Sequence, residues 1–480
     1  MQTDQNNPAR NDSTTYDLVT IGSGSAARAA ANEARRLGKT VAMIEHGAAG
    51  GTCLNVGCVP SKFLIAAAAA RFSAQHSRFA GIETSASGAN LGLLVDDKDR
   101  MIGGFREAFH VKGPIEAGID VLRGTASFAA SESADFVELT VSKPDEEAVR
   151  VRAGQVLIAT GAAPFIPDIA GLGDVEVLTS SSAMALDRVP ASLLVIGGNA
   201  IGLEQAQLFS RLGAKVTVVE VAPRIAPFED PAISTALMLA LSEEGIEFRT
   251  GANLTRVEAQ DGGVRATIAI GDDTYQLSAE KLLMATGRRP VTGDLELEMV
   301  GVQTGPRGEV PVDEYLRTAN PRIWAAGDVT GLAQLVYVAS EQGTTAAHNA
   351  LTGDLRALDY TTLPRVTFTS PEVAAVGMTP AQAQAAKIPY EVREFPVSFV
   401  LRAIVARHAS GLIKLVSNRE TDKILGVHMV GEAAGEVIAA ATYVLSAGFT
   451  VTQLATLWSP YFTMAESLKN VAKAAPVSQG

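Results

Sequence analysis

The sequence predicts an α/β fold with about three domains, and three observations lead to this prediction. The chain has 480 residues, which is more than one hydrophobic core usually organises. Apolar residues make up 47% of it and charged residues 19%, a balance typical of folded domains rather than of disorder. A pattern of strand, glycine turn and helix also occurs twice along the chain.

The first copy of this pattern starts with an apolar β-rich run at residues 16–21. A glycine turn over residues 22–27 follows, and then an alanine-rich helix that ends before Gly38. Residues 41–44 predict a second buried strand with Glu45 at its end. This is the order of a βαβ unit that binds a dinucleotide.

Three residues of the first turn have an expected role in holding such a ligand. Gly22 permits the tight turn, Gly24 lets the backbone approach a pyrophosphate, and Ala27 packs the helix against the strand. The N-terminus of the helix supplies N–H groups for the phosphates. Glu45, 23 residues after Gly22, is placed to accept hydrogen bonds from a ribose hydroxyl.

The second copy has a strand at residues 192–196, a turn from Gly197 to Gly202, and a second strand that ends at Glu220. Asn199 stands where the second glycine of the fingerprint usually lies, and its side chain would crowd a phosphate. Glu220 favours NADH, because a carboxylate repels the 2′-phosphate of NADPH. Arg224 leaves NADPH open, since its guanidinium would attract that phosphate.

The third domain lacks such glycine fingerprints. Apolar runs at 366–368, 412–416 and 424–430 predict strands, and residues 436–447 and 465–474 predict helices. We therefore expect an α+β domain after about residue 355.

The two cysteines of the sequence, Cys53 and Cys58, are five positions apart. So short a loop restricts the unfolded chain little, so a redox-active pair fits better than a structural disulfide or two inert buried thiols. In a regular helix their Cα atoms would lie about 7.5 Å apart along the axis, beyond the disulfide limit of roughly 7 Å. Gly57 and Pro60 are expected to relax this geometry, and a helix that begins near the pair would stabilise a thiolate at Cys58.

The segment from Gly50 to Lys62, with both cysteines, resembles the GTCxNxGCxPSK signature of the pyridine nucleotide-disulfide oxidoreductases. The resemblance covers nearly the whole chain. It implies FAD and NAD(P)H as cofactors and two Rossmann-like domains followed by an α+β dimerisation domain. The expected boundaries are 1–15 for a disordered tail, 16–155 with 285–355 for the FAD domain, 156–284 for the NAD(P) domain, and 356–480 for dimerisation.

The resemblance also assigns further residues. Lys62 would lie beside the flavin and pair with Glu204. The segments 159–161 and 285–288 resemble the two ATG connections between the domains, and 325–328 resembles the motif whose aspartate contacts the ribityl chain. The further cofactor-binding residues implied in this way are Gly51, Thr52, Thr160, Gly161, Gly287 and Asp328.

Within the family, segments 334–339 and 460–466 resemble those of mercuric reductases. Tyr461 stands where relatives that reduce organic disulfides carry a histidine, and Glu466 matches their glutamate. Tyrosine, with a pKa near 10, is a poor proton donor to a leaving thiolate, so Tyr461 is expected to help hold a metal ion across a homodimer interface. Cys53 and Cys58 would bind Hg(II) transiently as substrate.

Two departures from typical mercuric reductases leave the acceptor open. The sequence shows neither their vicinal C-terminal cysteines nor their N-terminal metal-binding domain, so Hg(II) would have to reach the two sulfurs directly. A reductase for an organic disulfide or another small acceptor is the alternative. A redox-responsive binding protein with negligible turnover is the alternative of another class.

Charge and composition exclude other classes. A net charge of −12 disfavours nucleic acid and anionic lipid as partners. The six histidines lack ligand spacing, so we expect no permanent metal. No apolar run is expected to approach the roughly 20 residues of a membrane span, so a cytoplasmic location is expected.

Overall fold

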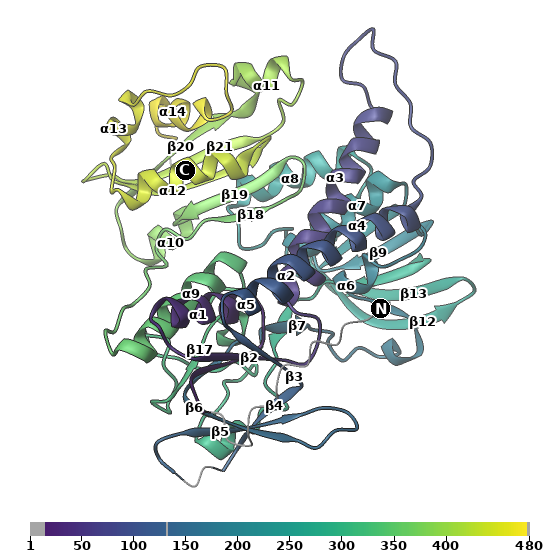
Figure 1. The fold of residues 1–480 in the computed structure, drawn as a ribbon. Coiled ribbons are helices and arrows are strands. Elements are labelled where there is room, and N and C mark those ends of the chain that lie inside the picture. The colour runs from purple at the N-terminus through teal and green to yellow at the C-terminus, as the bar shows by residue number, and fades with distance from the viewer. Residues whose placement is uncertain (1–14, 131–132, 478–480) are drawn as a thin grey trace. The chain divides into compact units, whose positions relative to one another are not determined.

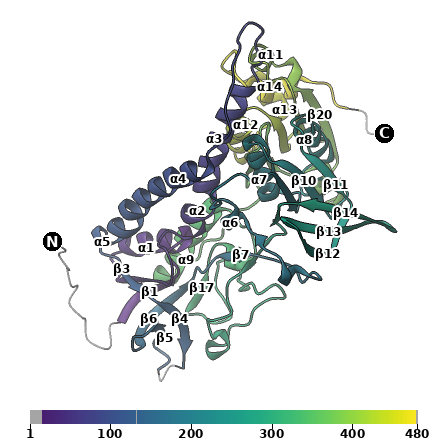
Figure 2. The ribbon, with the colours of Figure 1, turned by 90° about the vertical axis from the view of Figure 1, so that its right-hand side faces the viewer.

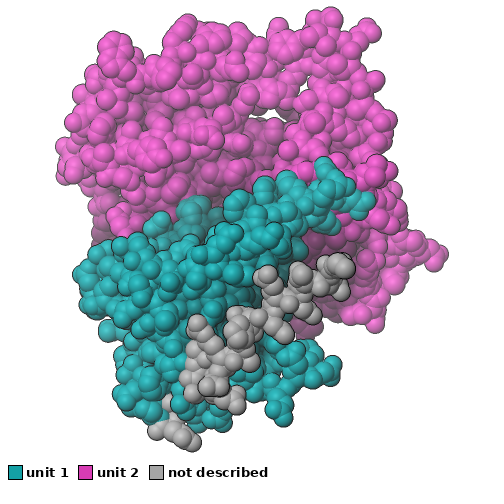
Figure 3. Space-filling view, in the orientation of Figure 1, with its two compact units in different colours: residues 1–60, 96–165, 287–358 teal, residues 61–95, 166–286, 359–480 magenta. Residues whose placement is uncertain are grey.

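The structure is a computed structural model that describes residues 15–130 and 133–477. The chain forms two compact units, one of residues 1–60, 96–165 and 287–358 and the other of residues 61–95, 166–286 and 359–480 (Figure 3). The expected tail lies outside the described residues except for Thr15, which begins the first strand. The division into domains expected from the sequence stays a prediction, since the units group residues 61–95 differently.

Unit 1 is built on a seven-stranded sheet with the order β3-β2-β1-β6-β5-β4, in which β17 pairs with β6 (Figure 1). β1 pairs in parallel with β2 and β6, whereas β4 and β5 continue the sheet in antiparallel pairs. Its strands are β1 (Thr15–Ile21), β2 (Val41–Glu45), β3 (Asp120–Arg123), β4 (Thr125–Ala129), β5 (Val137–Ser142), β6 (Val149–Ile158) and β17 (Ile323–Ala325), with a separate pair β7 (Ala162–Pro164) and β16 (Arg288–Pro290).

β1 is buried on both faces over most of its length, as expected for a central parallel strand. Leu18 of β1 packs with the alanines of α1 (Ser25–Arg36) and α9 (Val336–Thr352), which contact each other. Val19, the next residue of β1, lies in a different core with Phe128 and Leu139. Figure 2 shows α1 and α9 together beside the strands.

Unit 2 contains a five-stranded parallel sheet, an antiparallel three-stranded sheet and a second five-stranded sheet that is antiparallel. Their orders are β11-β10-β9-β15-β8, β12-β13-β14 and β18-β19-β22-β21-β20. The strands are β8 (Val177–Leu178), β9 (Ser192–Ile196), β10 (Lys215–Glu220), β11 (Glu247–Thr250), β12 (Ala252–Gln260), β13 (Gly263–Ile270), β14 (Asp273–Ala279), β15 (Lys281–Met284), β18 (Arg365–Thr367), β19 (Glu372–Gly377), β20 (Tyr390–Pro396), β21 (Leu412–Asn418) and β22 (Ile424–Gly431).

The helices connect and cover these sheets, and a π-helical stretch, Arg106–Lys112, continues α4. In the antiparallel part of unit 2, α12 packs on β19 and β22. The other helices are α2 (Gly51–Asn55), α3 (Cys58–Gln75), α4 (Leu91–Phe105), α5 (Gly113–Glu116), α6 (Ser180–Ala183), α7 (Ala200–Leu212), α8 (Pro231–Glu243), α10 (Pro380–Ala385), α11 (Leu401–Val405), α12 (Ala434–Ser446), α13 (Val451–Thr456) and α14 (Glu466–Lys473).

The elements expected from the sequence are present, and the fold class is confirmed. Both βαβ units match to within one or two residues, because the glycines that end their helices adopt positive φ, +73° at Gly38 and +114° at Gly213. The strands and helices expected after residue 355 are also found.

One expectation about the membrane is wrong. The helical stretch Gly51–Gln75, which joins α2 and α3, is long and apolar enough to span a bilayer by length and composition. Core helices of soluble proteins pass the same test. Leu64 and Ala68 of α3 are buried in the hydrophobic core of unit 2, and 28% of the apolar stretch is buried.

Candidate active site

The first glycine turn, between β1 and α1, is closed by contacts that only glycine permits. Gly22 has φ +111°, and a Cβ on it would lie 2.5 Å from the Ala159 carbonyl oxygen. Gly24 precedes α1, and a Cβ on Gly51 would lie 2.6 Å from the Gly24 Cα. Ala27 is fully buried. The turn therefore presents bare backbone at the N-terminus of α1, as a pyrophosphate site requires.

The second turn has the same construction between β9 and α7. Gly197 has φ +110°, and a Cβ on it would lie 2.3 Å from the Ala285 carbonyl oxygen. A Cβ on Gly202 would lie 1.9 Å from the Gly197 carbonyl oxygen, so the third glycine allows close packing of helix on strand. Asn199 precedes α7 with extended backbone, and its side chain does not cap the helix.

The N-termini of α1 and α7, which follow the two glycine turns, are not capped by side chains. Neither α1 nor α7 has a side-chain cap or an acidic residue in its first turn. By contrast, Asp230 caps α8 and accepts the Ala232 N–H at 2.9 Å. The first N–H groups of α1 and α7 thus remain available for phosphate oxygens.

Glu45 and Glu220 close the two turns in the same way. The Oε2 atom of Glu45 accepts the Ser23 N–H at 3.1 Å, and its Oε1 atom accepts the Gly47 N–H at 2.7 Å. Glu220 accepts the Gly198 N–H at 2.6 Å and the Ala222 N–H at 2.7 Å. Oε2 of Glu45 also accepts the Ser23 hydroxyl at 2.6 Å. The other three oxygens, Oε1 of Glu45 and both of Glu220, each have a second lone pair for a ribose hydroxyl.

Arg224 is turned toward its own loop. Its Nη2 atom donates to the carbonyl oxygens of Pro227, at 2.8 Å, and Glu229, at 3.3 Å. Its Nε atom is buried and makes no hydrogen bond with the described part of the chain. The guanidinium thus donates hydrogen bonds to the backbone of residues 224–229, so fewer of its N–H groups are available to a 2′-phosphate.

The two cysteines flank a break between helices. Cys53 lies in α2, which ends at Asn55, and Cys58 is the first residue of α3. A Cβ on Gly57 would lie 2.9 Å from the Thr52 carbonyl oxygen and 3.3 Å from the Cys53 Cα, so the absence of a side chain lets the two segments approach. Cys53 is half-buried and Cys58 exposed. The expected relief at Gly57 and the helix start near the pair are both present.

Arg288 adds positive charge near the second cysteine. Burial lowers the pKa of its guanidinium, while the negative charges of Asp328 and Cys58 act in the opposite direction. Its Nε atom lies 4.0 Å from Oδ2 of Asp328, whose own pKa is raised by burial. An arginine within electrostatic reach favours the thiolate of Cys58.

Lys62, on α3, and Glu204, on α7, form the expected ion pair at 2.7 Å. The other oxygen of Glu204 accepts the Phe368 N–H at 2.9 Å, and Lys62 Nζ lies 4.4 Å from the centre of the Phe368 ring. Glu204 is therefore held from two sides. Phe368 was not expected from the sequence as part of this group.

A family model for the pyridine nucleotide-disulfide oxidoreductases matches residues 16–343, and the model of that family's dimerisation domain matches residues 363–472. Together they cover most of the chain. The chain belongs to the pyridine nucleotide-disulfide oxidoreductases.

Similar proteins of known activity fall within this family. The chain is 50% identical to a mercuric reductase of Streptomyces lividans over 96% of each chain. It is 37% identical to a dihydrolipoamide dehydrogenase of Chaetomium thermophilum, over 95% of this chain and 90% of that one. Among solved structures, the HOCl-induced flavoprotein disulfide reductase RclA from Escherichia coli aligns with a TM-score of 0.83 at 28% identity, over 95% of this chain and 99% of that one.

Membership implies that this oxidoreductase is an NAD(P)H-dependent flavoenzyme with FAD. The two glycine turns, the uncapped helix ends and the carboxylates at the strand ends suit two dinucleotides. The match to the dimerisation domain supports a homodimer.

Tyr461 and Glu466 lie in the last part of the oxidoreductase. Tyr461 is 72% exposed and packs against Phe462, with ring centres 5.8 Å apart. Glu466, at the start of α14, accepts the Phe462 N–H at 2.8 Å and so holds this turn. The tyrosine thus stands on a fixed turn and faces outward.

The ATG segments and their neighbours also hold backbone together. Thr160 donates to the Val291 carbonyl oxygen at 2.6 Å, and the Val291 N–H donates to Gly161 at 3.1 Å. Gly161 and Gly287 have positive φ, +71° and +111°. These contacts join the segment that follows β6 to the residue that follows β16 within unit 1.

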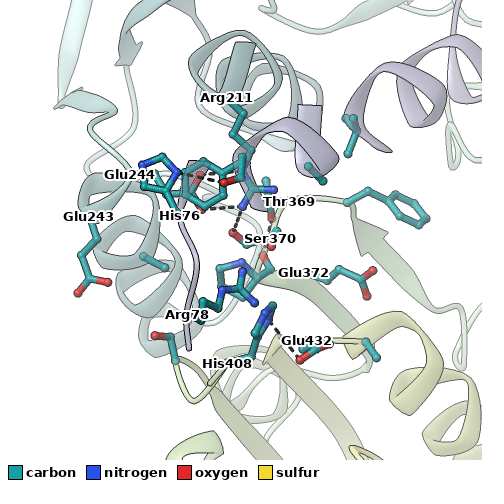
Figure 4. Close-up of a pocket in the computed structure, with 18 of the residues that line it drawn as sticks. His76, Arg78, Arg211, Glu243, Glu244, Thr369, Ser370, Glu372, His408 and Glu432 are labelled. Atoms are coloured by element: carbon teal, nitrogen blue, oxygen red, sulfur yellow. Dashed lines mark hydrogen bonds and ion pairs between the residues drawn. The ribbon is translucent and has the colours of Figure 1, made fainter. Parts of the chain in front are cut away.

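Unit 2 also holds a cavity of about 660 Å³ (Figure 4). Lys62 and Phe368 line part of its wall. Arg211 in this wall is paired with Glu244 at 2.6 Å, and His408 lies 3.2 Å from Glu432. The cavity therefore borders the Lys62–Glu204 pair, and much of its charge is already paired within the wall.

Sequence reasoning missed one polar contact beside the cysteines. Arg106, at the start of the π-helical stretch, donates from Nε to Oδ1 of Asn55 at 2.8 Å. Asn55 is part of the cysteine signature, but nothing in the sequence links it to a residue 51 positions later.

Proposed function

We propose that this oxidoreductase reduces Hg(II) to Hg(0) with electrons from NAD(P)H, and that Cys53 and Cys58 are the dithiol that binds the metal ion. The observation that carries the proposal is the placement of Cys58, exposed at the first residue of α3 and within electrostatic reach of Arg288. Deprotonated thiols are soft ligands and suit a soft metal ion. Relatives named mercuric reductase, at up to 50% identity, support this substrate.

The electrons are transferred in pairs. FAD, when bound, would supply a carrier that accepts electrons from NAD(P)H and passes them on in pairs. One pair converts the Cys53–Cys58 disulfide to a dithiol, with Arg288 favouring the thiolate at Cys58. The two sulfurs then bind Hg(II), and a second pair reduces the ion to Hg(0), which leaves.

Two sets of residues would hold the cofactors. FAD would lie on the first turn and the segments around it, where bare backbone meets the N-terminus of α1. The residues involved are Gly22, Gly24, Ala27, Glu45, Gly51, Thr52, Lys62, Thr160, Gly161, Gly287 and Asp328. NAD(P)H would lie on the second turn, with Gly197, Gly202 and Glu220.

The nicotinamide nucleotide is NADH. Glu220 places a negative charge at the end of β10, where a 2′-phosphate would stand, and Arg224 is bonded to its own loop. Both features favour a ribose with a bare 2′-hydroxyl.

In the homodimer, Tyr461 and Glu466 act at the partner's dithiol. The phenolic oxygen of Tyr461 would contact the bound metal ion, and Glu466 holds the turn that presents it. Lys62 and Glu204 act beside the flavin as a fixed pair of charges.

The oxidoreductase is cytoplasmic, with no membrane or nucleic acid as partner. The net charge of −12 supports this part of the proposal, as does the packing of Leu64 and Ala68 of α3 in a core.

The test is steady-state oxidation of NADH and of NADPH by the purified FAD-loaded dimer, with HgCl₂ in excess 2-mercaptoethanol and release of Hg(0) vapour recorded in parallel. We expect Hg(II)-stimulated oxidation that is faster at low NADH than at low NADPH, and its loss in Cys53→Ser and Cys58→Ser. Tyr461→Phe should lower the rate, whereas Tyr443→Phe, an equally exposed tyrosine of the same domain, should not.

Other acceptors are the competing outcomes of this test. Turnover with lipoamide or glutathione disulfide, and none with Hg(II), would mean a disulfide reductase in spite of Tyr461. Rapid flavin reduction without turnover on disulfides, quinones or metal ions would indicate a redox-responsive binding protein.

A further inference from the structure

Asn55 holds the loop in front of the first cysteine. Its Nδ2 atom donates to three carbonyl oxygens, those of Ala48 at 3.2 Å, Ala49 at 3.1 Å and Gly51 at 2.9 Å. Asn55 is also the last residue of α2, between Cys53 and the break before Cys58. One amide therefore ties the entry of α2 to its end.

The loop that Asn55 holds is itself closely fitted to the first glycine turn. Gly50 and Gly51 both have positive φ, +106° and +65°. A Cβ on Gly51 would lie 2.6 Å from the Gly24 Cα. A shift of this loop would therefore displace both Cys53 and the glycine turn assigned to the FAD pyrophosphate.

Arg106 determines which way the amide of Asn55 points. A guanidinium can only donate, so its Nε–H selects the orientation in which Oδ1 faces Arg106 at 2.8 Å and Nδ2 faces the three carbonyls. Within the described ranges, residues 15–130 and 133–477, this is the one hydrogen bond that the Arg106 side chain makes. A charged donor makes it stronger than a neutral one.

The backbone around Arg106 fixes its direction. Arg106 begins the π-helical stretch, and its neighbours Phe105 and Phe109 are 43% and 56% exposed. Single π-helical turns within helices change which side chains point inward. Here the aromatic rings point to solvent while the arginine reaches α2.

We propose that Arg106 is a positioning residue for the Cys53–Cys58 pair and acts through Asn55. The proposal rests on the redox role given to these cysteines above. By holding Asn55, Arg106 fixes the last turn of α2, and with it the separation of the two sulfurs that must form and break one bond. Without Arg106, fewer molecules would hold the two sulfurs at a distance that allows the disulfide bond to form.

The test replaces Arg106 by Met, which keeps a long side chain but removes the donor. Arg100→Met is the matched control, since Arg100 lies on α4 in the same unit, is 75% exposed and pairs only locally with Asp97. Three quantities are measured on the FAD-loaded dimer: the reduction potential of the dithiol, the long-wavelength thiolate-to-flavin absorbance, and the rate of cysteine alkylation by iodoacetamide against pH.

For Arg106→Met we expect the equilibrium constant of disulfide formation to change by about tenfold, or about 30 mV in potential for two electrons. The thiolate-to-flavin absorbance should weaken and alkylation should shift with pH, while Arg100→Met matches the wild type. Asn55→Asp, which keeps an acceptor for Arg106 but loses the Nδ2 donor group, should reproduce the effect. The double variant should show less than the sum of the two changes.

Arg106→Met that behaves like Arg100→Met in all three measurements would overturn the proposal. If Arg106→Met is unstable, Asn55→Asp is measured in its place. An effect of that variant on the melting temperature alone would also contradict the proposal. Failure of the proposed function is seen separately, because turnover on Hg(II) enters none of these measurements.

Discussion

The carboxylate of Glu220 accepts the backbone N–H of Gly198 at 2.6 Å, so the acidic residue at the end of β10 is fastened to the glycine turn that precedes α7. The same bond joins Glu45 to Ser23 in the first turn. A carboxylate held in this way cannot swing aside for a larger ligand. Its charge is therefore fixed at the end of β10, where we propose that the nucleotide ribose binds.

Glu220→Gln should weaken the preference for NADH. Glutamine keeps an oxygen for the Gly198 N–H but removes the charge that repels a 2′-phosphate. We expect the ratio of kcat/KM for NADH to that for NADPH to fall by about tenfold, which is about 1.4 kcal/mol. Glu247→Gln, a carboxylate on the neighbouring strand β11 that pairs with Lys215 at 3.4 Å, is the control. An unchanged ratio would show that Glu220 does not select the nucleotide.

Gly57→Ala should separate the two cysteines. The new Cβ would lie 2.9 Å from the Thr52 carbonyl oxygen and 3.3 Å from the Cys53 Cα, so one of the two segments must move. We expect slower reoxidation of the dithiol, by about tenfold or more, and weaker thiolate-to-flavin absorbance. Gly103→Ala is the control, because that glycine lies in α4 with nothing within 4 Å of a Cβ. Reoxidation at the same rate in both variants would contradict the packing argument.

Much of the site was predictable because its parts are local in sequence. The spacing from Gly22 to Glu45, and from Gly197 to Glu220, follows from one strand, one helix and one strand, so the residues that meet can be counted along the chain. The cysteine pair and Gly57 are local in the same sense. Their geometry was expected from the rise of a helix, and the break at Gly57 agrees with it.

The contacts that sequence reasoning missed are distant in the chain. Arg106 lies 51 positions from Asn55, and the Phe368 N–H lies 164 positions from Glu204. Periodicity reports which face of an element is buried, but it does not report which other element will cover that face. Lys62 and Glu204 were paired only through a family resemblance, and no pattern of their own sequence neighbours would have joined them.

Lys62→Met should slow electron transfer and leave Glu204 without its cation. Lys62 is 34% and Glu204 8% exposed, so the pair is partly screened and its loss should cost about 1–2 kcal/mol of stability. Reduction of the flavin by NADH should slow by about tenfold in stopped-flow measurements. Adding Glu204→Gln should restore stability but not the rate. Lys281→Met, which breaks the pair with Glu176, should leave the rate of flavin reduction unchanged.

His428 should make the stability of the protein fall in mild acid. Burial lowers the pKa of this histidine, with the Met378 carbonyl acting in the opposite direction, and its Nδ1 atom makes no hydrogen bond within the described chain. Because the folded pKa lies below the unfolded value of about 6.5, the stabilising term is fully present above that pH. It is lost as the pH falls through the folded pKa, since the unfolded chain binds the proton first.

His428→Gln removes this titration but can keep a donor for the Met378 carbonyl. Between pH 7.5 and 5.5 the melting temperature of the wild type should therefore fall by about 2 °C more than that of His428→Gln. His76→Gln, at an exposed histidine, should follow the wild type. Parallel curves for all three proteins would mean that His428 titrates at its ordinary pKa in the folded state and carries no acid-dependent stability.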